Sequence, residues 1–149
     1  MKPEDFYTKP AHNEGRRLPL FLPDGTDSGE WLEVVGIDSD AFQAAMTETR
    51  RQLLASDIAI STAKAKALES GNEPADLDRI TADIRRLSED RQAVMTEREA
   101  ATKAAYIKDW SFDKPCTQEN ALEFIINAPP VADQIDQYCS NRMNFLKKK

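Results

Sequence analysis

The chain has 149 residues, of which 40% are apolar and 31% are charged, and its formal net charge is -6. This length permits one domain with a core, or an elongated helical body with small terminal parts, and the high charged content favours the elongated form. Nucleic-acid binding needs clustered Lys and Arg, so the acidic balance argues against DNA or RNA as a partner. The chain shows no signal-peptide pattern and no window near the roughly 18 to 20 apolar residues that cross a bilayer. We therefore expect a cytoplasmic protein with no membrane partner.

Residues 1–17 contain many charges and few apolar anchors, which predicts a flexible arm or an irregular edge. The only histidine, His12, lies in this arm without Cys, Asp or Glu at the spacing of metal ligands. We therefore expect His12 to be solvated, with no metal or acid–base role.

A β-hairpin is predicted over residues 18–35. Leu18–Leu22 is a short apolar run, Pro23–Gly29 is rich in turn residues, and Glu30–Val35 alternates between polar and apolar positions. A lone hairpin is marginal in water, so this one must pack on a third strand or on the following helix. The residues expected to make that contact are Phe21, Trp31, Leu32 and Val34 or Val35.

Two long helices follow, over residues of about 39–70 and 75–108, because apolar and small residues recur there at heptad spacing. Asp38 or Ser39 is the expected N-cap of the first helix, and the turn residues 70–72 end it. The short link at Pro74 makes the helices antiparallel neighbours. The first row is Phe42, Met46, Thr49, Leu53, Ser56, Ile60, Ala63 and Ala67. The second is Leu77, Ile80, Ile84, Leu87, Arg91, Val94, Arg98, Ala101 and Ala105.

The two heptad rows are expected to leave part of their apolar surface exposed in a hairpin of two helices. Arg91 and Arg98 interrupt the second row, and each must extend to water, pair with an acid or face a partner. A two-helix hairpin cannot bury both rows completely. We therefore expect self-association, as a homo-oligomer, or docking by the terminal parts of the chain.

A small helical pair is predicted after residue 108. Thr117 is a good N-cap, and a helix runs from it until Asn127 and Pro129 stop it. A last helix is expected from about Val131 to Phe145. The predicted fold is mainly α, with three parts: an arm and small N-terminal β-hairpin (1–37), a long antiparallel helical hairpin (38–108) and a C-terminal pair of short helices (109–149).

The sequence contains no phosphate-binding loop, no nucleophile elbow and no metal-ligand pattern, so we expect no enzyme, no cofactor and no metal. The carboxylates of the second long helix alternate with arginines, which is typical of a solvated, salt-bridged face. Cys116 and Cys139 lie too far apart for a metal pair. Both are expected to be reduced, with Cys139 buried on a helix face and Cys116 beside a helix start.

Aromatic and proline residues gather in the C-terminal part, and two interpretations of them stay open. Trp110, Phe112 and Phe124 are either core residues of this part or the lining of a groove for a short helix or extended segment of a partner. In the second case the candidate partner-binding residues are Trp110, Phe112, Pro115, Phe124, Pro129 and Phe145.

Two blocks, residues 20–42 (LFLPDGTDSGEWLEVVGIDSDAF) and 110–145 (from Trp-Ser-Phe to Asn-Arg-Met-Asn-Phe), resemble the tail assembly chaperones of bacteriophages with long non-contractile tails. The resemblance implies a non-enzymatic, largely helical protein of the infected bacterial cytoplasm. Such proteins hold the tape measure protein while tail tube protein polymerises around it, and they are absent from the finished virion. It also implies that Lys147–Lys149 could be encoded by a slippery run of nucleotides that yields a longer frameshifted form.

Two other classes compete with this interpretation. The first is a structural virion component, such as a head–tail adaptor or minor capsid protein, in which the hairpin and arm lock into a ring. The second is an antitoxin-like or adaptor coiled coil with no relation to phages. Purified virions that contain the chain would favour the first, and the genes beside its own would decide the second.

Overall fold

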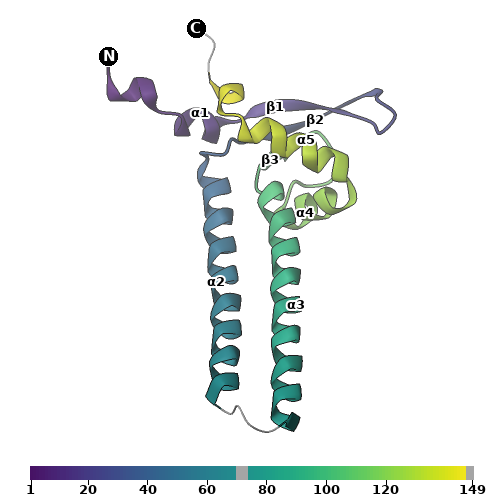
Figure 1. Cartoon of the computed structure of the whole chain (residues 1–149). Helices are drawn as coiled ribbons and strands as arrows, with labels where there is room; N and C mark the ends of the chain where they lie inside the picture. The colour runs from purple at the N-terminus through teal and green to yellow at the C-terminus, as the bar shows by residue number, and fades with distance from the viewer. Residues whose placement is uncertain (70–73, 147–149) are drawn as a thin grey trace. The chain divides into compact units, whose positions relative to one another are not determined.

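The computed structural model describes residues 1–69 and 74–146 and is mainly helical (Figure 1). The elements in chain order are η1 (Pro3–Phe6), α1 (Lys9–Glu14), β1 (Arg16–Phe21), β2 (Asp27–Val34), α2 (Asp40–Glu69), α3 (Pro74–Ala104), β3 (Ile107–Trp110), α4 (Gln118–Asn127), α5 (Pro129–Ser140) and η2 (Arg142–Phe145). They form two units. One contains Met1–Met46 and the described residues from Ala100 onward, and the other contains the described residues of Thr47–Glu99.

A three-stranded antiparallel sheet in the order β1-β2-β3 organises the first unit. The predicted hairpin pairs Arg16 with Val34 at its open end and Phe21 with Asp27 near its turn. At the turn, Gly25 has φ 88°, a conformation that favours glycine. The third strand was not predicted as such: β3 pairs with β2, from Leu32 opposite Trp110 to Val34 opposite Ile107. The hairpin thus packs on a third strand, one of the two outcomes expected from the sequence.

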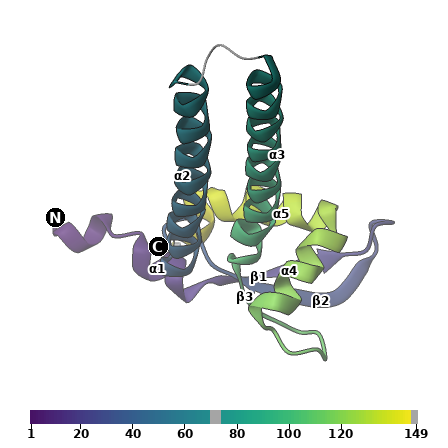
Figure 2. The same cartoon turned by 90° about the horizontal axis from the view of Figure 1, so that it is seen from below.

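Helices α4 and α5 pack on this sheet (Figure 2). The core lies between the two helices and the strands. Every second residue of the strands faces this core. Each of the two helices contributes the small and aliphatic side chains of one of its sides. The buried set includes Leu18, Leu20, Leu32, Val34, Trp110, Ala121, Ile125, Ala132, Ile135, Cys139 and Phe145. Two of the residues predicted to pack in this contact do not do so. Phe21 is 50% exposed. Trp31 lies on the face of the sheet opposite to that of Leu32, because strand residues alternate, and there Cζ of Arg17 lies 3.9 Å from the centre of the half-buried Trp31 ring.

The predicted antiparallel helical hairpin is present as α2 and α3. The residues of both heptad rows are half-buried within the second unit, except Leu77, which is 44% exposed. Of the seam arginines, Arg91 pairs with an acid, one of the three outcomes expected, with Nε 2.7 Å from Asp57 Oδ1, and Arg98 Nε donates to Thr49 Oγ1 at 3.1 Å. Among the described residues of 47–99, none is fully buried. The hairpin therefore leaves both rows partly open, as the sequence indicated.

Several helix limits match the sequence expectations. Ser39 caps α2 by accepting from the N–H of Phe42, and Thr117 caps α4 by accepting from the N–H of Asn120. Helix α4 ends at Asn127, as predicted. The predicted helix end at residues 70–72 and the lysines 147–149 lie outside the described residues.

Other limits were wrong. Helix α3 ends at Ala104 instead of residue 108, because Ile107–Trp110 joins the sheet. The predicted helix from Val131 to Phe145 is divided into α5 and η2, because Asn141 is extended and its side chain accepts from the N–H of Met143. Residues 1–17, expected to be a flexible arm or an irregular edge, contain η1, α1 and the start of β1. The first and last of the three predicted parts pack together in one unit.

No helix in the described part of the chain is long and apolar enough to cross a membrane.

Replacement of Leu32 should test the core, since this side chain is fully buried where β2 pairs with both neighbours. We expect Leu32→Ala to lower the free energy of unfolding of this unit by about 2 to 5 kcal/mol. Urea denaturation followed by tryptophan fluorescence measures it, because both tryptophans, Trp31 and Trp110, lie in this unit. Leu22→Ala, at a half-exposed position near the turn, is the control and should cost below about 0.5 kcal/mol. Equal losses in the two variants would contradict the assignment.

Candidate partner-binding site

Three of the predicted aromatic residues meet at the end of β3. The ring of Trp110 lies 5.3 Å from that of Phe112 and 5.9 Å from that of Phe124, and the last two rings are 5.4 Å apart. The rings are tilted or edge-on to one another, the arrangement that aromatic pairs prefer. Trp110 is buried, whereas Phe112 and Phe124 are half-buried. The cluster therefore combines one buried ring with two rings that remain partly accessible.

The loop between β3 and α4 is held at both ends by hydrogen bonds. The indole Nε1 of Trp110 donates to the carbonyl of Lys114 at 2.6 Å, and the side-chain amide of Asn120 donates to the carbonyl of Pro115 at 2.9 Å. Ser111 donates to the carboxylate of Glu30 and accepts from the N–H of Trp31. These bonds fix the loop that carries Phe112 and the exposed Pro115. A partner that binds there would not need to order it first.

The remaining predicted site residues lie elsewhere. Pro129 is exposed and is the first residue of α5, a position that suits its missing N–H. Phe145 is fully buried, with its ring 4.9 Å from His12 and 5.7 Å from Tyr138. Phe145 thus offers no surface to a partner in this structure. The candidate surface is reduced to Phe112 and Phe124, supported by Trp110 and beside Pro115.

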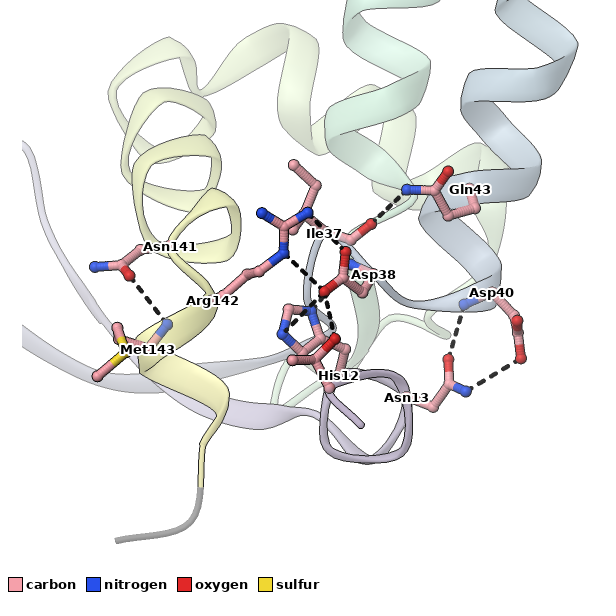
Figure 3. Close-up of polar contacts among 10 residues, drawn as sticks. His12, Asn13, Ile37, Asp38, Asp40, Gln43, Asn141, Arg142 and Met143 are labelled. Carbon is pink, nitrogen blue, oxygen red and sulfur yellow. Dashed lines mark hydrogen bonds and ion pairs between the residues drawn. The ribbon is translucent and has the colours of Figure 1, made fainter. Parts of the chain in front are cut away.

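A second cluster, which sequence reasoning missed, gathers around Asp38 (Figure 3). The guanidinium of Arg142 donates to both carboxylate oxygens, at 2.8 and 3.0 Å, and the hydroxyl of Thr8 donates to Oδ2 at 2.6 Å. Hydrogen bonds from Arg142 lower the pKa of Asp38 to about 2. The cluster joins η2 to the N-terminal segment through one ionised carboxylate.

His12 completes this cluster and is fully buried, so the expectation of a solvated residue was wrong. The backbone N–H of Asp38 donates to Nδ1 of His12 at 3.0 Å, which assigns the proton of a neutral imidazole to Nε2. Gly36 permits this contact, since a Cβ there would lie 2.0 Å from Nδ1. Nothing in the local sequence around His12 marks it as a core residue.

The cluster has the character of a structural lock. Nε2 of His12 is buried without a hydrogen-bond partner and lies 3.9 Å from Oδ2 of Asp38. Burial lowers the pKa of His12, although the charge of Asp38 opposes this shift. Because the ring has no exposed atom, a substrate cannot reach it. The arrangement orients the chain and offers no accessible base.

The two cysteines are the other reactive side chains of the first unit. Both cysteines are free, as expected, with Cys139 buried and Cys116 half-buried. Burial raises the pKa of both thiols, which keeps them protonated at neutral pH. Within the residues that the structure describes, no group of three His, Cys, Asp or Glu side chains could hold a metal ion.

One hollow lies in the first unit and has a volume of about 260 Å³. That is below the roughly 300 to 1,000 Å³ of small-molecule pockets. Its lining residues are Asn13, Val35, Ser39, Asp40, Ala41, Ala105, Ile107 and Lys108. The more promising surface for recognition is the aromatic cluster.

Comparisons with known proteins identify no relative: no protein-family model, curated protein or solved structure matches the chain. The fold and the candidate site define a mainly helical chain of two units with an aromatic, half-exposed surface.

The buried imidazole predicts a pH dependence of stability. Because the pKa of His12 is lower in the folded chain than its ordinary value of 6.5, the unfolded chain binds more protons below about pH 6.5. The free energy of unfolding should therefore decrease as the pH falls from 7.5 to 5.5. The contribution of Asp38, whose pKa is lowered to about 2, is lost only below about pH 4.

The variant His12→Asn isolates this effect, because the amide oxygen can accept the N–H of Asp38 without titrating. Urea denaturation at pH 7.5 and 5.5 should show a smaller difference in the variant than in the unchanged chain. If both lose the same free energy, the titrating group is not His12.

Proposed function

We propose that this chain is a tail assembly chaperone of a bacteriophage with a long non-contractile tail. It binds the tape measure protein in the bacterial cytoplasm and assists polymerisation of the tail tube protein around it. The observation that carries the proposal is that the two resembling blocks, 20–42 and 110–145, belong to one compact unit. The resemblance thus follows a unit of structure, although the two blocks are far apart in the sequence.

The surfaces of the chain suit the holding of a long helical polymer with apolar rows. Phe112 and Phe124 offer a rigid aromatic surface of the kind that accepts an apolar helix face. In the other unit, the half-buried rows of α2 and α3 leave apolar surface that a helix could cover reversibly. The formal charge of -6 favours solubility at the high copy number that a chaperone needs.

The binding surface can be tested by co-expression with the tape measure protein of a phage whose genome encodes this chain. We expect Phe112→Ala with Phe124→Ala to weaken capture on an affinity resin by roughly 30-fold or more, which corresponds to about 2 kcal/mol for an aromatic hot spot. The matched control is Phe21→Ala, which removes a half-exposed phenylalanine from the hairpin turn of the same unit. Circular dichroism must show unchanged helix content in both variants. Unchanged capture by the double variant would place the binding surface elsewhere.

One observation favours the alternative, a head–tail adaptor or minor capsid protein. Exposed apolar residues also lie on the N-terminal segment, at Phe6 and Tyr7, and at the hairpin end, at Phe21 and Leu22. Such projections could lock into neighbouring subunits of a ring. Mass spectrometry of purified virions separates the two functions, because a chaperone is absent from the finished particle and an adaptor is present at the copy number of its ring.

A further inference from the structure

The outer side of α2 carries a second row of apolar and small side chains, distinct from the row that faces α3. Its members are Leu54, Ile58, Ser61, Ala65 and Leu68. At about 100° per residue, the five lie within roughly 40° of one direction, which is roughly 130° away from the seam row. All five are exposed, and Leu54, Ile58 and Leu68 expose 60%, 57% and 87% of their surface.

Among the described residues of α3, the side that faces away from the seam shows no such row of large apolar side chains. The side of α3 that faces away from its seam carries Asp78, Arg85, Glu89, Gln92 and Thr96. A two-helix hairpin needs one apolar row on each helix, and α3 follows this rule. The second row on α2 therefore has no partner within the described part of the hairpin, and contiguous exposed apolar surface of this kind marks an interaction site.

The row on α2 is nearly symmetric about Ser61. Leu54 and Leu68 stand at equal separations before and after it, and Ile58 and Ala65 stand close to it on either side. If a second copy lies antiparallel with the two Ser61 residues in contact, each Leu54 meets Leu68 of the other copy. The small serine at the centre lets the helices approach closely. Such self-complementarity is what a two-fold interface requires.

The charges beside the row select the same arrangement. Asp57 and Lys64 border one side of it, and Arg51 and Glu69 border the other. In an antiparallel pair, each border faces the same border of the second copy in reverse order. Asp57 then meets Lys64 and Arg51 meets Glu69, each twice. Exposed pairs add little affinity, but they fix register and direction.

A parallel pair of copies would be disfavoured by repulsion, because it brings Arg50 and Arg51 of one copy to the same level as Arg50 and Arg51 of the other. The intramolecular pairs do not prevent the antiparallel contacts. The side chain of Arg51 remains 68% exposed beside Glu48, and that of Asp57 remains 53% exposed beside Arg91.

We propose that two copies of this chain associate through the outer row of α2, antiparallel and with a two-fold axis at Ser61. The proposal does not depend on the proposed function, since a dimer of this kind would serve a chaperone or an adaptor equally. The contact spans residues 54–68, about 20 Å of helix, so the dimer should be in measurable exchange with the monomer.

Disulfide crosslinking tests the register directly. In a Cys116→Ser background, which leaves only the buried Cys139, we expect Ser61→Cys to give a covalent dimer under mild oxidation. Leu54→Cys should crosslink to Leu68→Cys in a mixture but not to itself, because its two copies would lie about 20 Å apart. The control is Gln92→Cys, at an exposed position on the outer side of α3. This variant should form no covalent dimer under the same oxidation.

Sedimentation equilibrium of the unmodified chain tests the association itself. The average mass should rise with concentration from 16.8 kDa toward twice that value. Ile58→Glu should raise the dissociation constant by about tenfold or more, while Gln92→Glu leaves it unchanged. Arg51→Glu should weaken the dimer, and the added change Glu69→Arg should restore it.

A chain that stays monomeric at every concentration overturns the proposal, as does a Ser61→Cys variant that crosslinks no better than Gln92→Cys. Self-crosslinking of Leu54→Cys would overturn the antiparallel direction. A monomeric chain whose outer row becomes protected only with the tape measure protein would assign the row to that partner instead.

Discussion

The pairing of β3 with β2 is the contact on which the first unit depends. It joins Leu32 to Trp110 and Val34 to Ile107, residues separated by the whole helical hairpin in the sequence. The N–H of Val35 donates to the carbonyl of Tyr106, and the ring of Tyr106 stacks on Phe42 at 4.2 Å, which extends the contact to the start of α2. Without β3 the sheet would be a lone two-stranded hairpin, which is marginal in water, and α4 and α5 would have a smaller sheet face to cover. The aromatic cluster begins at the last residue of this strand, so the candidate site depends on the same pairing.

The polar cluster around Asp38 makes a second set of long-range contacts within this unit, besides the pairing of β2 with β3. Arg142 and Thr8 reach one carboxylate from opposite ends of the chain, and the buried ring of His12 packs between Gly36 and Phe145. These contacts restrain the segments around Thr8, His12 and Arg142 before any partner arrives. Rigid surfaces lose less conformational entropy on binding. The cluster around Asp38 thus has a structural role, and by restraining the terminal segments it supports the recognition that we propose for the aromatic residues.

The helical hairpin follows a different physical rule from the first unit. Two helices alone bury little surface, and the described residues of 47–99 are at most half-buried. In the seam, Arg91 forms an ion pair with Asp57 and Arg98 donates a hydrogen bond to Thr49, and both arginines occupy places where aliphatic residues would have packed. The hairpin therefore keeps apolar area available on more than one side. An open seam suits a reversible helical partner, and the symmetric outer row of α2 suits a second copy.

The sequence by itself determined the two long helices and the start and end of α4, because heptad spacing and caps such as Ser39 and Thr117 are local signals. It also determined the hairpin of β1 and β2 and the incomplete burial of the seam. Only the tertiary structure decided that Ile107–Trp110 is a strand, since a four-residue segment after a long helix has no period of its own and becomes a strand by pairing with β2. The burial of His12 was equally inaccessible, because its partners Asp38 and Phe145 come from distant parts of the chain. For the same reason the sequence placed Phe145 with the aromatic site, although long-range packing assigns it to the core. Local pattern sets the elements, and contacts between residues far apart in the chain decide which of them form the core.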